Sequence, residues 1–256
     1  MEGRSEAASV LTPAELAEAK RTLAGASAGE ILAWADARFG VCAAISSSFG
    51  VEDVVLIDLA AAAAPRLRVF TLDTGRLPPE TYEVMEEVRR RYQIGIESWF
   101  PDRTAVERLE GEQGFFSFRR SVEDRKECCA IRKLEPLSRA LHGVSAWVTG
   151  LRRGQSVTRA SIETVEIASE QGGILKLNPL AAWSEADVWD YAREHAVPLN
   201  ALHARGYPSI GCAPCTRAVA PGEDVRAGRW WWESPEHKEC GLHARPAPET
   251  RTPETR

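Results

Sequence analysis

The sequence predicts an α/β fold in which a mostly parallel sheet is flanked by helices. Short apolar runs alternate along the chain with amphipathic stretches that open on helix-capping residues, and this alternation is typical of strand–helix–strand units. Two of the apolar runs end in turns of small polar residues, at the edge where such sheets bind their ligands. With 256 residues, 44% of them hydrophobic, the chain can bury a sizeable core.

The first two helices are predicted from their capping residues. Thr12 and Ser27 each stand three residues before a glutamate, Glu15 and Glu30, which is the pattern of a capping box. The second helix should end at Gly40. Residues 1–11 are mostly small and polar, and we expect this N-terminus to be disordered.

The run Val41–Ile45 predicts a buried strand with Cys42 in the core. A turn of small residues follows it, and then a helix from near Glu52 to Ala64. Backbone amides and hydroxyls converge at such a turn, and the helix dipole favours negative charge there. The candidate contacts to a phosphate or sulfate are Ser46, Ser47, Ser48 and Gly50. An ordinary strand-to-helix turn is the alternative, and the lack of a lysine argues against a Walker-type nucleoside triphosphatase.

A second strand, Leu67–Leu72, stops at another such turn, and a helix starts at Pro78-Pro79-Glu80. The turn supplies the further candidates Asp73, Thr74 and Gly75. Because the carboxyl ends of parallel strands share one edge of the sheet, the two turns predict a nucleotide pocket.

The remaining apolar runs complete the sheet. Further strands are expected at Ile94–Phe100 and Ala146–Gly150, and a hairpin of Val165–Ala168 and Ile174–Leu177 at the sheet's edge. Further helices are expected at Thr104–Gln113 and after Ser184, the latter packing Val188, Trp189 and Tyr191 into the core.

Three arginines within eight residues follow the fourth strand directly. Arg152, Arg153 and Arg159 come just after Gly150, and the guanidinium fork matches phosphate and sulfate oxygens. Arg152 and Arg159 are therefore candidate anion contacts.

Four of the six cysteines form two close pairs, Cys128-Cys129 and Cys212-x-x-Cys215. Two such pairs suit one metal centre, because each lies on a short backbone segment. Two adjacent cysteines are too close in the chain for an ordinary zinc knuckle, in which residues separate the paired ligands. In an iron–sulfur cube, two neighbouring cysteines can each bind a different iron atom. An iron–sulfur centre is favoured, with zinc as the alternative. A disulfide framework fits poorly, since no apolar secretory segment opens the chain.

Basic residues accompany these cysteines. Lys133 follows the first pair by a helical turn, and we favour a functional role for it over a merely solvated one.

The chain is expected to form one domain with a mobile C-terminal segment. Residues 12–217 should form one nucleotide- and cluster-binding domain. Residues 218–244 are rich in Gly, Pro, Arg and Trp and predict a mobile segment that carries Cys240 and His243 to the pocket. Residues 245–256 should be a disordered tail.

The overall charge limits the partners. A formal net charge of −5 argues against a general nucleic-acid binder, although it permits a local basic pocket. No apolar stretch is long enough to cross a bilayer, so we expect no membrane contact and a cytoplasmic location.

Four motifs in order resemble the assimilatory adenylyl-sulfate (APS) reductases of the PAPS reductase family. They are Cys128-Cys129-x-x-Arg132-Lys133, Thr149-Gly150-x-Arg152-Arg153-x-Gln155-Ser156, Tyr207-Pro208-Ser209-Ile210-Gly211-Cys212-x-x-Cys215-Thr216 and Lys238-Glu239-Cys240-Gly241-Leu242-His243. The likeness runs from about Ser46 to His243, although Ser46–Gly50 departs from the family's usual Ser-Gly-Ala turn. It implies a fold similar to the adenine nucleotide alpha hydrolases, with a [4Fe-4S] cluster on Cys128, Cys129, Cys212 and Cys215. It also implies reduction of APS to sulfite and AMP with thioredoxin.

The expected chemistry starts with attack of the Cys240 thiolate on the sulfate sulfur of APS, which expels AMP and leaves an S-sulfonate. Thioredoxin then releases sulfite by thiol exchange. The candidate cations are Lys133, Arg152, Arg159, Arg226 and Arg229, and His243 would lower the pKa of the thiol or orient it.

Three other functions remain open at this stage. The chain could reduce PAPS or both nucleotides, although the PAPS-specific enzymes lack the cysteine pairs. It could be a tRNA-thiolating transferase of the same fold, or a non-catalytic module stabilised by zinc. Whether it forms a homo-oligomer is also open.

Overall fold

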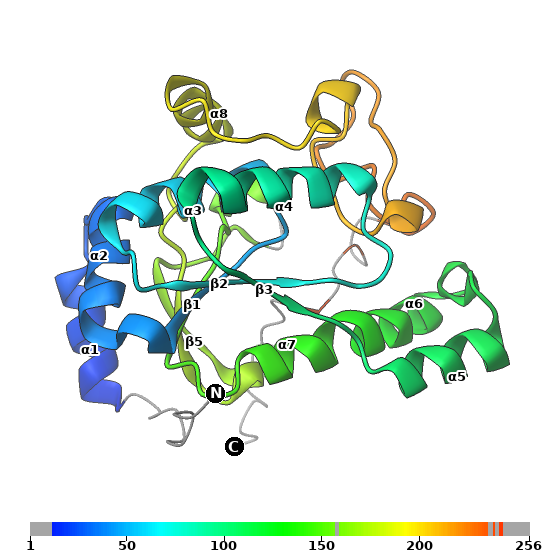
Figure 1. Ribbon diagram of the computed structural model, residues 1–256, viewed down its shortest axis with the longest axis horizontal. Coiled ribbons are helices and arrows are strands. Elements are labelled where there is room, and N and C mark those ends of the chain that lie inside the picture. Colours follow the sequence, from blue (N-terminus) through cyan, green and yellow to red (C-terminus); the bar gives the residue numbers. More distant parts are fainter. Residues whose placement is uncertain (1–11, 157–158, 235–237, 239–240, 243–256) are drawn as a thin grey trace, which may run out of the picture.

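The computed structural model of the protein describes residues 12–156, 159–234, 238 and 241–242. Within these ranges a six-stranded sheet has the order β3-β2-β1-β4-β6-β5, and helices cover both faces (Figure 1). The strands are β1 (Ala43–Ser46), β2 (Arg68–Leu72), β3 (Ile96–Trp99), β4 (Ala146–Val148), β5 (Val165–Ala168) and β6 (Ile174–Leu177). All neighbouring strands are parallel except β5 and β6, which pair antiparallel at the edge. The predicted α/β class and edge hairpin are confirmed.

The helices alternate with the strands as the capping residues predict. They are α1 (Pro13–Thr22), α2 (Ala28–Phe39), α3 (Val51–Ala63), α4 (Pro79–Tyr92), α5 (Arg103–Gln113), α6 (Val122–Cys129), α7 (Glu135–Ala140) and α8 (Glu185–Glu194). Thr12, Ser27 and Ser184 each accept a hydrogen bond from the backbone three residues on, in complete capping boxes. The predicted strands at Ile94–Phe100 and Ala146–Gly150 prove shorter at their ends, so Gly150 lies beyond β4.

The prediction that Cys42 lies in a core strand is wrong. Gly40–Cys42 form a turn of 3₁₀ helix, and Cys42 is exposed, as is Val41. The pairing of β1 starts only at Ala44 with β2 and at Ala43 with β4, because Gly40, with φ of 51°, redirects the chain before them. An apolar run alone does not show where the neighbouring strands begin.

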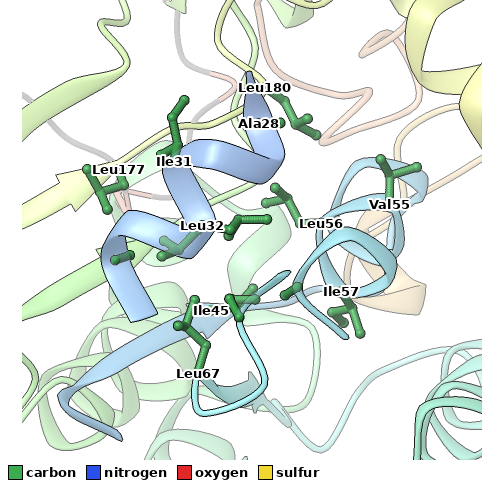
Figure 2. Close-up of a cluster of buried hydrophobic side chains, with 14 of the residues drawn as sticks. Ala28, Ile31, Leu32, Ile45, Val55, Leu56, Ile57, Leu67, Leu177 and Leu180 are labelled. Atoms are coloured by element: carbon green, nitrogen blue, oxygen red, sulfur yellow. The ribbon is translucent and has the colours of Figure 1, made fainter. Parts of the chain in front are cut away.

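The core on one face of the sheet is built mainly by α2 and α3. Figure 2 shows Leu32 of α2 and Leu56 of α3 lying over Ile45 of β1, and all three are buried. Trp189 and Tyr191 of α8 are partly buried against this core. On the other face Leu137 and Ala140 of α7 pack on Phe70 and Trp147. These two layers hold the strands so that their carboxyl ends meet at one edge.

Helices α6 and α7 belong to one interrupted helix. Between them Ala130–Leu134 form a π-helical turn directly after the cysteine pair. Such turns often occur at functional sites. None of the helices in the described ranges has the length and apolar character that a membrane span requires.

Candidate functional site

A cavity of about 220 Å³ opens at the carboxyl ends of the strands. Its walls include the turns after β1, β2 and β4, residues of the interrupted helix, and parts of the chain after residue 198. Eleven of the residues predicted as contacts line it: Ser46, Ser47, Ser48, Gly50, Thr74, Lys133, Gly150, Arg152, Arg159, Arg226 and Arg229. Asp73 and Gly75 are not among the lining residues.

The turn after β1 is braced by a carboxylate. Asp53, in the first turn of α3, accepts hydrogen bonds from the Ser48 backbone N–H at 2.6 Å and from its hydroxyl at 2.8 Å. Burial raises the pKa of Asp53 to about 6, with the neighbouring Glu52 adding to the effect against the hydrogen bonds from Ser48. Asp53 therefore fixes the shape of this turn through both hydrogen-bond donors of Ser48.

In the turn after β2, the side chains of Asp73 and Thr74 have different surroundings: Asp73 bonds to its own turn and to Tyr82, and Thr74 lines the cavity. The Asp73 carboxylate accepts from the Gly75 backbone N–H at 2.9 Å and from the Tyr82 hydroxyl, so it braces the turn. Burial, with help from this hydrogen bond, raises the pKa of Tyr82 to about 12. Thr74 lines the cavity, and its hydroxyl lies 3.3 Å from the Cys212 sulfur.

The arginines after β4 are held by acidic and amide groups. Arg152 is buried and donates from Nε and Nη2 to one oxygen of Glu52, at 3.1 and 2.8 Å. Gln155 donates to the same oxygen and accepts from Arg159 at 2.6 Å. Arg152 is thus positioned in the pocket by Glu52, which sequence reasoning missed, because acidic residues are common in first helical turns.

Gly150 is required by close packing. A Cβ added there would lie 2.4 Å from the Asp53 carboxylate and 3.3 Å from the Asp53 backbone nitrogen. The absence of a side chain lets the end of β4 approach the N-terminus of α3, and so brings the first and third turns together.

A second, smaller cavity is lined by all four paired cysteines, Cys128, Cys129, Cys212 and Cys215. All four thiols are buried and free of disulfides. Burial raises the pKa of Cys128, and that of Cys215 to about 12. Burial also favours a higher pKa for Cys212. The positive charge of Lys133 and the hydrogen bond with the Thr74 hydroxyl outweigh burial, so the pKa of Cys212 is lowered.

Cationic and N–H donors surround this cysteine cavity. Arg76, Arg125, Arg132, Lys133 and Arg229 line it. The Nε atoms of Arg132 and Arg229 and the indole nitrogen of Trp230 are buried without a hydrogen-bond partner. Unpaired buried donors are costly, so this donor set fits an anionic group held by the four sulfurs.

The two cavities adjoin each other. Lys133, Arg229 and Trp230 line both, so positive charge lies between the cysteines and the pocket. The guanidinium of Arg229 lies against the backbone of Gly211, where an added Cβ would be 2.3 Å from Nη2. Across the described ranges, no group of three or more Cys, His, Asp or Glu residues has an arrangement that could hold a metal ion.

The segment after residue 217 is anchored where the structure describes it. Arg229 and Trp230 are buried, and Leu242 lines the pocket while packing against the core on the α7 side of the sheet. The predicted nucleophile Cys240 and its neighbour His243 lie outside the described residues.

Fold and site together define an α/β protein with an anion pocket at the strand ends and a buried thiol site beside it. The model of the phosphoadenosine phosphosulfate reductase domain matches residues 42–218. The chain therefore belongs to this family, and it is an oxidoreductase that acts on a sulfur group.

Named relatives agree with this assignment. The adenosine 5'-phosphosulfate reductase of Allochromatium vinosum is 56% identical over 200 residues, which cover 78% of each chain. That of Pseudomonas aeruginosa is 48% identical over 237 residues, covering 91% of this chain and 88% of the relative.

Solved structures show the same architecture. A phosphoadenylyl-sulfate reductase from Candida auris, in a phosphate complex, superposes with a TM-score of 0.68 at 30% identity, covering 82% of this chain and 98% of the other. An FMN adenylyltransferase from Candida glabrata, with a TM-score of 0.53 at 15% identity, covers 89% of this chain and 75% of its own and shares the fold alone.

Proposed function

We propose that this protein reduces adenosine 5'-phosphosulfate (APS) to sulfite and AMP, with thioredoxin as the reductant. The observation that carries this is a basic anion pocket that shares Lys133 and Arg229 with a cavity lined by four buried thiols. The likeness to adenosine 5'-phosphosulfate reductases supports the choice of substrate. The activity would belong to cytoplasmic sulfate assimilation towards cysteine.

In the first step, the Cys240 thiolate attacks the sulfur of APS. The S–O bond to the phosphate breaks, AMP leaves with the electron pair, and Cys240 carries an S-sulfonate. The basic residues Lys133, Arg152, Arg159, Arg226 and Arg229 neutralise the anions, and His243 activates or orients the thiol. Leu242, two residues after Cys240, lines the pocket and supports a nucleophile from this part of the chain.

In the second step, a thioredoxin thiolate attacks the Cys240 sulfur and sulfite leaves. The second thioredoxin thiol then resolves the mixed disulfide and frees Cys240. The two electrons that reduce the sulfur come from this dithiol, so the reaction balances without another donor.

We infer that the four paired cysteines would hold a [4Fe-4S] cluster, each thiol on a separate iron, although no group of three or more such residues in the described ranges is arranged around a single metal ion. The buried free thiols and the unpartnered N–H groups around them fit such an anionic centre. When bound, the cluster would supply a charged iron–sulfur centre beside the pocket, and no electron of the reaction needs to pass through it. Lys133 and Arg229 then keep positive charge between it and the substrate.

The test is mass spectrometry of the protein after incubation with APS alone. We expect a sulfonate adduct on Cys240 that disappears on addition of reduced thioredoxin. Cys42→Ser, which removes an exposed thiol, should still form the adduct, whereas Cys240→Ser should not. Undiminished sulfite release by Cys240→Ser would overturn the proposed nucleophile.

A second substrate is suggested by the resemblance to the Candida auris phosphoadenylyl-sulfate reductase. The chain could accept PAPS as well as APS or in its place. Rates with both nucleotides, measured on the same iron-loaded preparation, separate these possibilities, and a clear preference for PAPS would overturn the choice of APS.

A further inference from the structure

A buried ion pair ties the C-terminal part of the chain to the first cysteine pair. Arg125 of α6 donates from Nε and Nη2 to the two carboxylate oxygens of Glu233, at 3.0 and 2.9 Å. The Arg125 side chain is 0% exposed and that of Glu233 3%. Neither residue lines the substrate pocket, so pocket chemistry does not explain the pair.

Arg125 also reaches the cysteines. It stands one helical turn before Cys129 and makes a hydrogen bond with the side chain of that residue. A guanidinium has five N–H donors in a fixed fork, so one arginine can hold Glu233 and Cys129 together.

The segment that Glu233 ends is residues 228–233, here called the tryptophan segment. Its Trp230 has a φ of 40°, a conformation that costs free energy in a residue other than glycine. The guanidinium carbons of Arg125 and Arg229 lie 4.8 and 4.6 Å from the centre of the Trp230 ring. The Trp230 backbone N–H donates to the Cys215 carbonyl at 3.1 Å.

These contacts reach both cysteine pairs. Arg125 connects the tryptophan segment to Cys129, and the backbone of Trp230 connects it to Cys215. Trp230 also lines the cysteine cavity. The strained backbone persists only while its surroundings hold it, and the bidentate ion pair is the strongest of these contacts.

We propose that the Arg125–Glu233 pair is a clamp that closes the tryptophan segment over the cysteine cavity and shields the iron–sulfur cluster from solvent. The shielding rests on the proposed function, because it requires the cluster. The clamping of the tryptophan segment does not require the cluster and stands independently of that function. The clamp also keeps Arg229 at the boundary between the two cavities.

The test compares two glutamate-to-glutamine variants in the C-terminal part of the chain, one inside the tryptophan segment and one before it. Glu233→Gln removes the buried charge, whereas Glu223→Gln removes a partly exposed pair with Arg217. Each iron-loaded protein is treated with an iron chelator in the presence of oxygen, and loss of visible cluster absorbance is followed. We expect Glu233→Gln to lose its cluster about tenfold faster than wild type, and Glu223→Gln to match wild type.

Limited trypsin digestion gives a readout that does not depend on iron. Cleavage after Arg217 and Arg226 should be faster in Glu233→Gln, with global unfolding followed by circular dichroism in parallel. If Glu233→Gln does not fold, Arg125→Lys, which keeps the charge but loses the fork, should show the same two effects at smaller size.

The outcomes separate the two proposals. Equal cluster loss and equal cleavage in Glu233→Gln and wild type would overturn the clamp. Faster cleavage with unchanged cluster loss would overturn the shielding and leave only the clamping of the segment. Wild-type protein without iron after anaerobic preparation would overturn the proposed cofactor, while the trypsin comparison would still decide whether the clamp exists.

Discussion

The substrate pocket and the cysteine cavity share Lys133, Arg229 and Trp230 but are built differently. Much of the pocket wall comes from turns that directly follow β1, β2 and β4, so the sheet register positions it. The cavity is formed by a helix interrupted after Cys129 and by loops near Cys215. The pocket therefore depends mainly on the register of the sheet, whereas the cavity depends on how the interrupted helix packs against loops.

The largest expected effect is in the cysteine cavity. Cys215→Ser should abolish iron binding and sulfite release, because a cluster with a missing ligand is not retained. Far-UV circular dichroism should stay close to wild type, since the core around α2 and α3 does not include these cysteines. Cys42→Ser is the matched control and should keep its iron. A Cys215→Ser protein with full iron content would show that the cysteine cavity is not the iron site, and would contradict the contrast drawn between cavity and pocket.

Next in size is a change confined to the pocket. Arg152→Ala removes a buried cation and its two bonds to Glu52, and should lower kcat/KM about 100-fold. Iron content should be unchanged, because Arg152 does not line the cysteine cavity. Arg153→Ala alters an exposed neighbour and should leave kcat/KM near wild type. Steady-state kinetics with an iron assay would measure both, and parallel loss of iron in Arg152→Ala would contradict the separation.

A smaller effect is expected where two turns of the pocket meet. Gly150→Ala places a Cβ against Asp53 and should lower the free energy of unfolding by about 1–3 kcal/mol, with a loss in anion affinity. Gly154→Ala is the control in the same loop, since its Cβ would meet nothing nearer than 3.7 Å. Urea unfolding of both variants measures the difference. Equal stability would show that α3 and β4 can move apart.

The smallest effect is a pH dependence of the pocket. Because the pKa of Asp53 is raised to about 6, its carboxylate is protonated below that pH and ionised above it. The stability linked to the protonated form is lost as pH rises through about 6, and a negative charge then appears in the pocket. Sulfate, whose charge is constant in this range, should inhibit a few-fold better at about pH 5.5 than at about pH 7.5.

The control for this dependence is Asp53→Asn, which should make sulfate inhibition nearly flat over the same range. Burial lowers the pKa of His203, which also lines the pocket, so this ring gains its charge only at more acidic pH. An unchanged pH profile in Asp53→Asn would assign the dependence to another group.

The sequence by itself determined the local features of this protein. Capping boxes, apolar runs and small-residue turns indicate where helices begin and strands end, because they depend on neighbours only a few residues apart. The basic residues after β4 and the two cysteine pairs were recognisable for the same reason. Val41 and Cys42 show the limit, since an apolar run does not reveal which of its residues the adjacent strands will cover.

Only the tertiary structure decided which charges meet. Glu52 pairs with Arg152, 100 positions away in the chain, and Glu233 pairs with Arg125, 108 positions away. No local sequence pattern predicts a contact between residues so far apart in the chain. It also turned Asp73 towards Tyr82, while Thr74 beside it faces the pocket. The physical reason is that a charge is stabilised by whatever lies within a few ångströms, and that neighbourhood exists only once the sheet and its loops have packed.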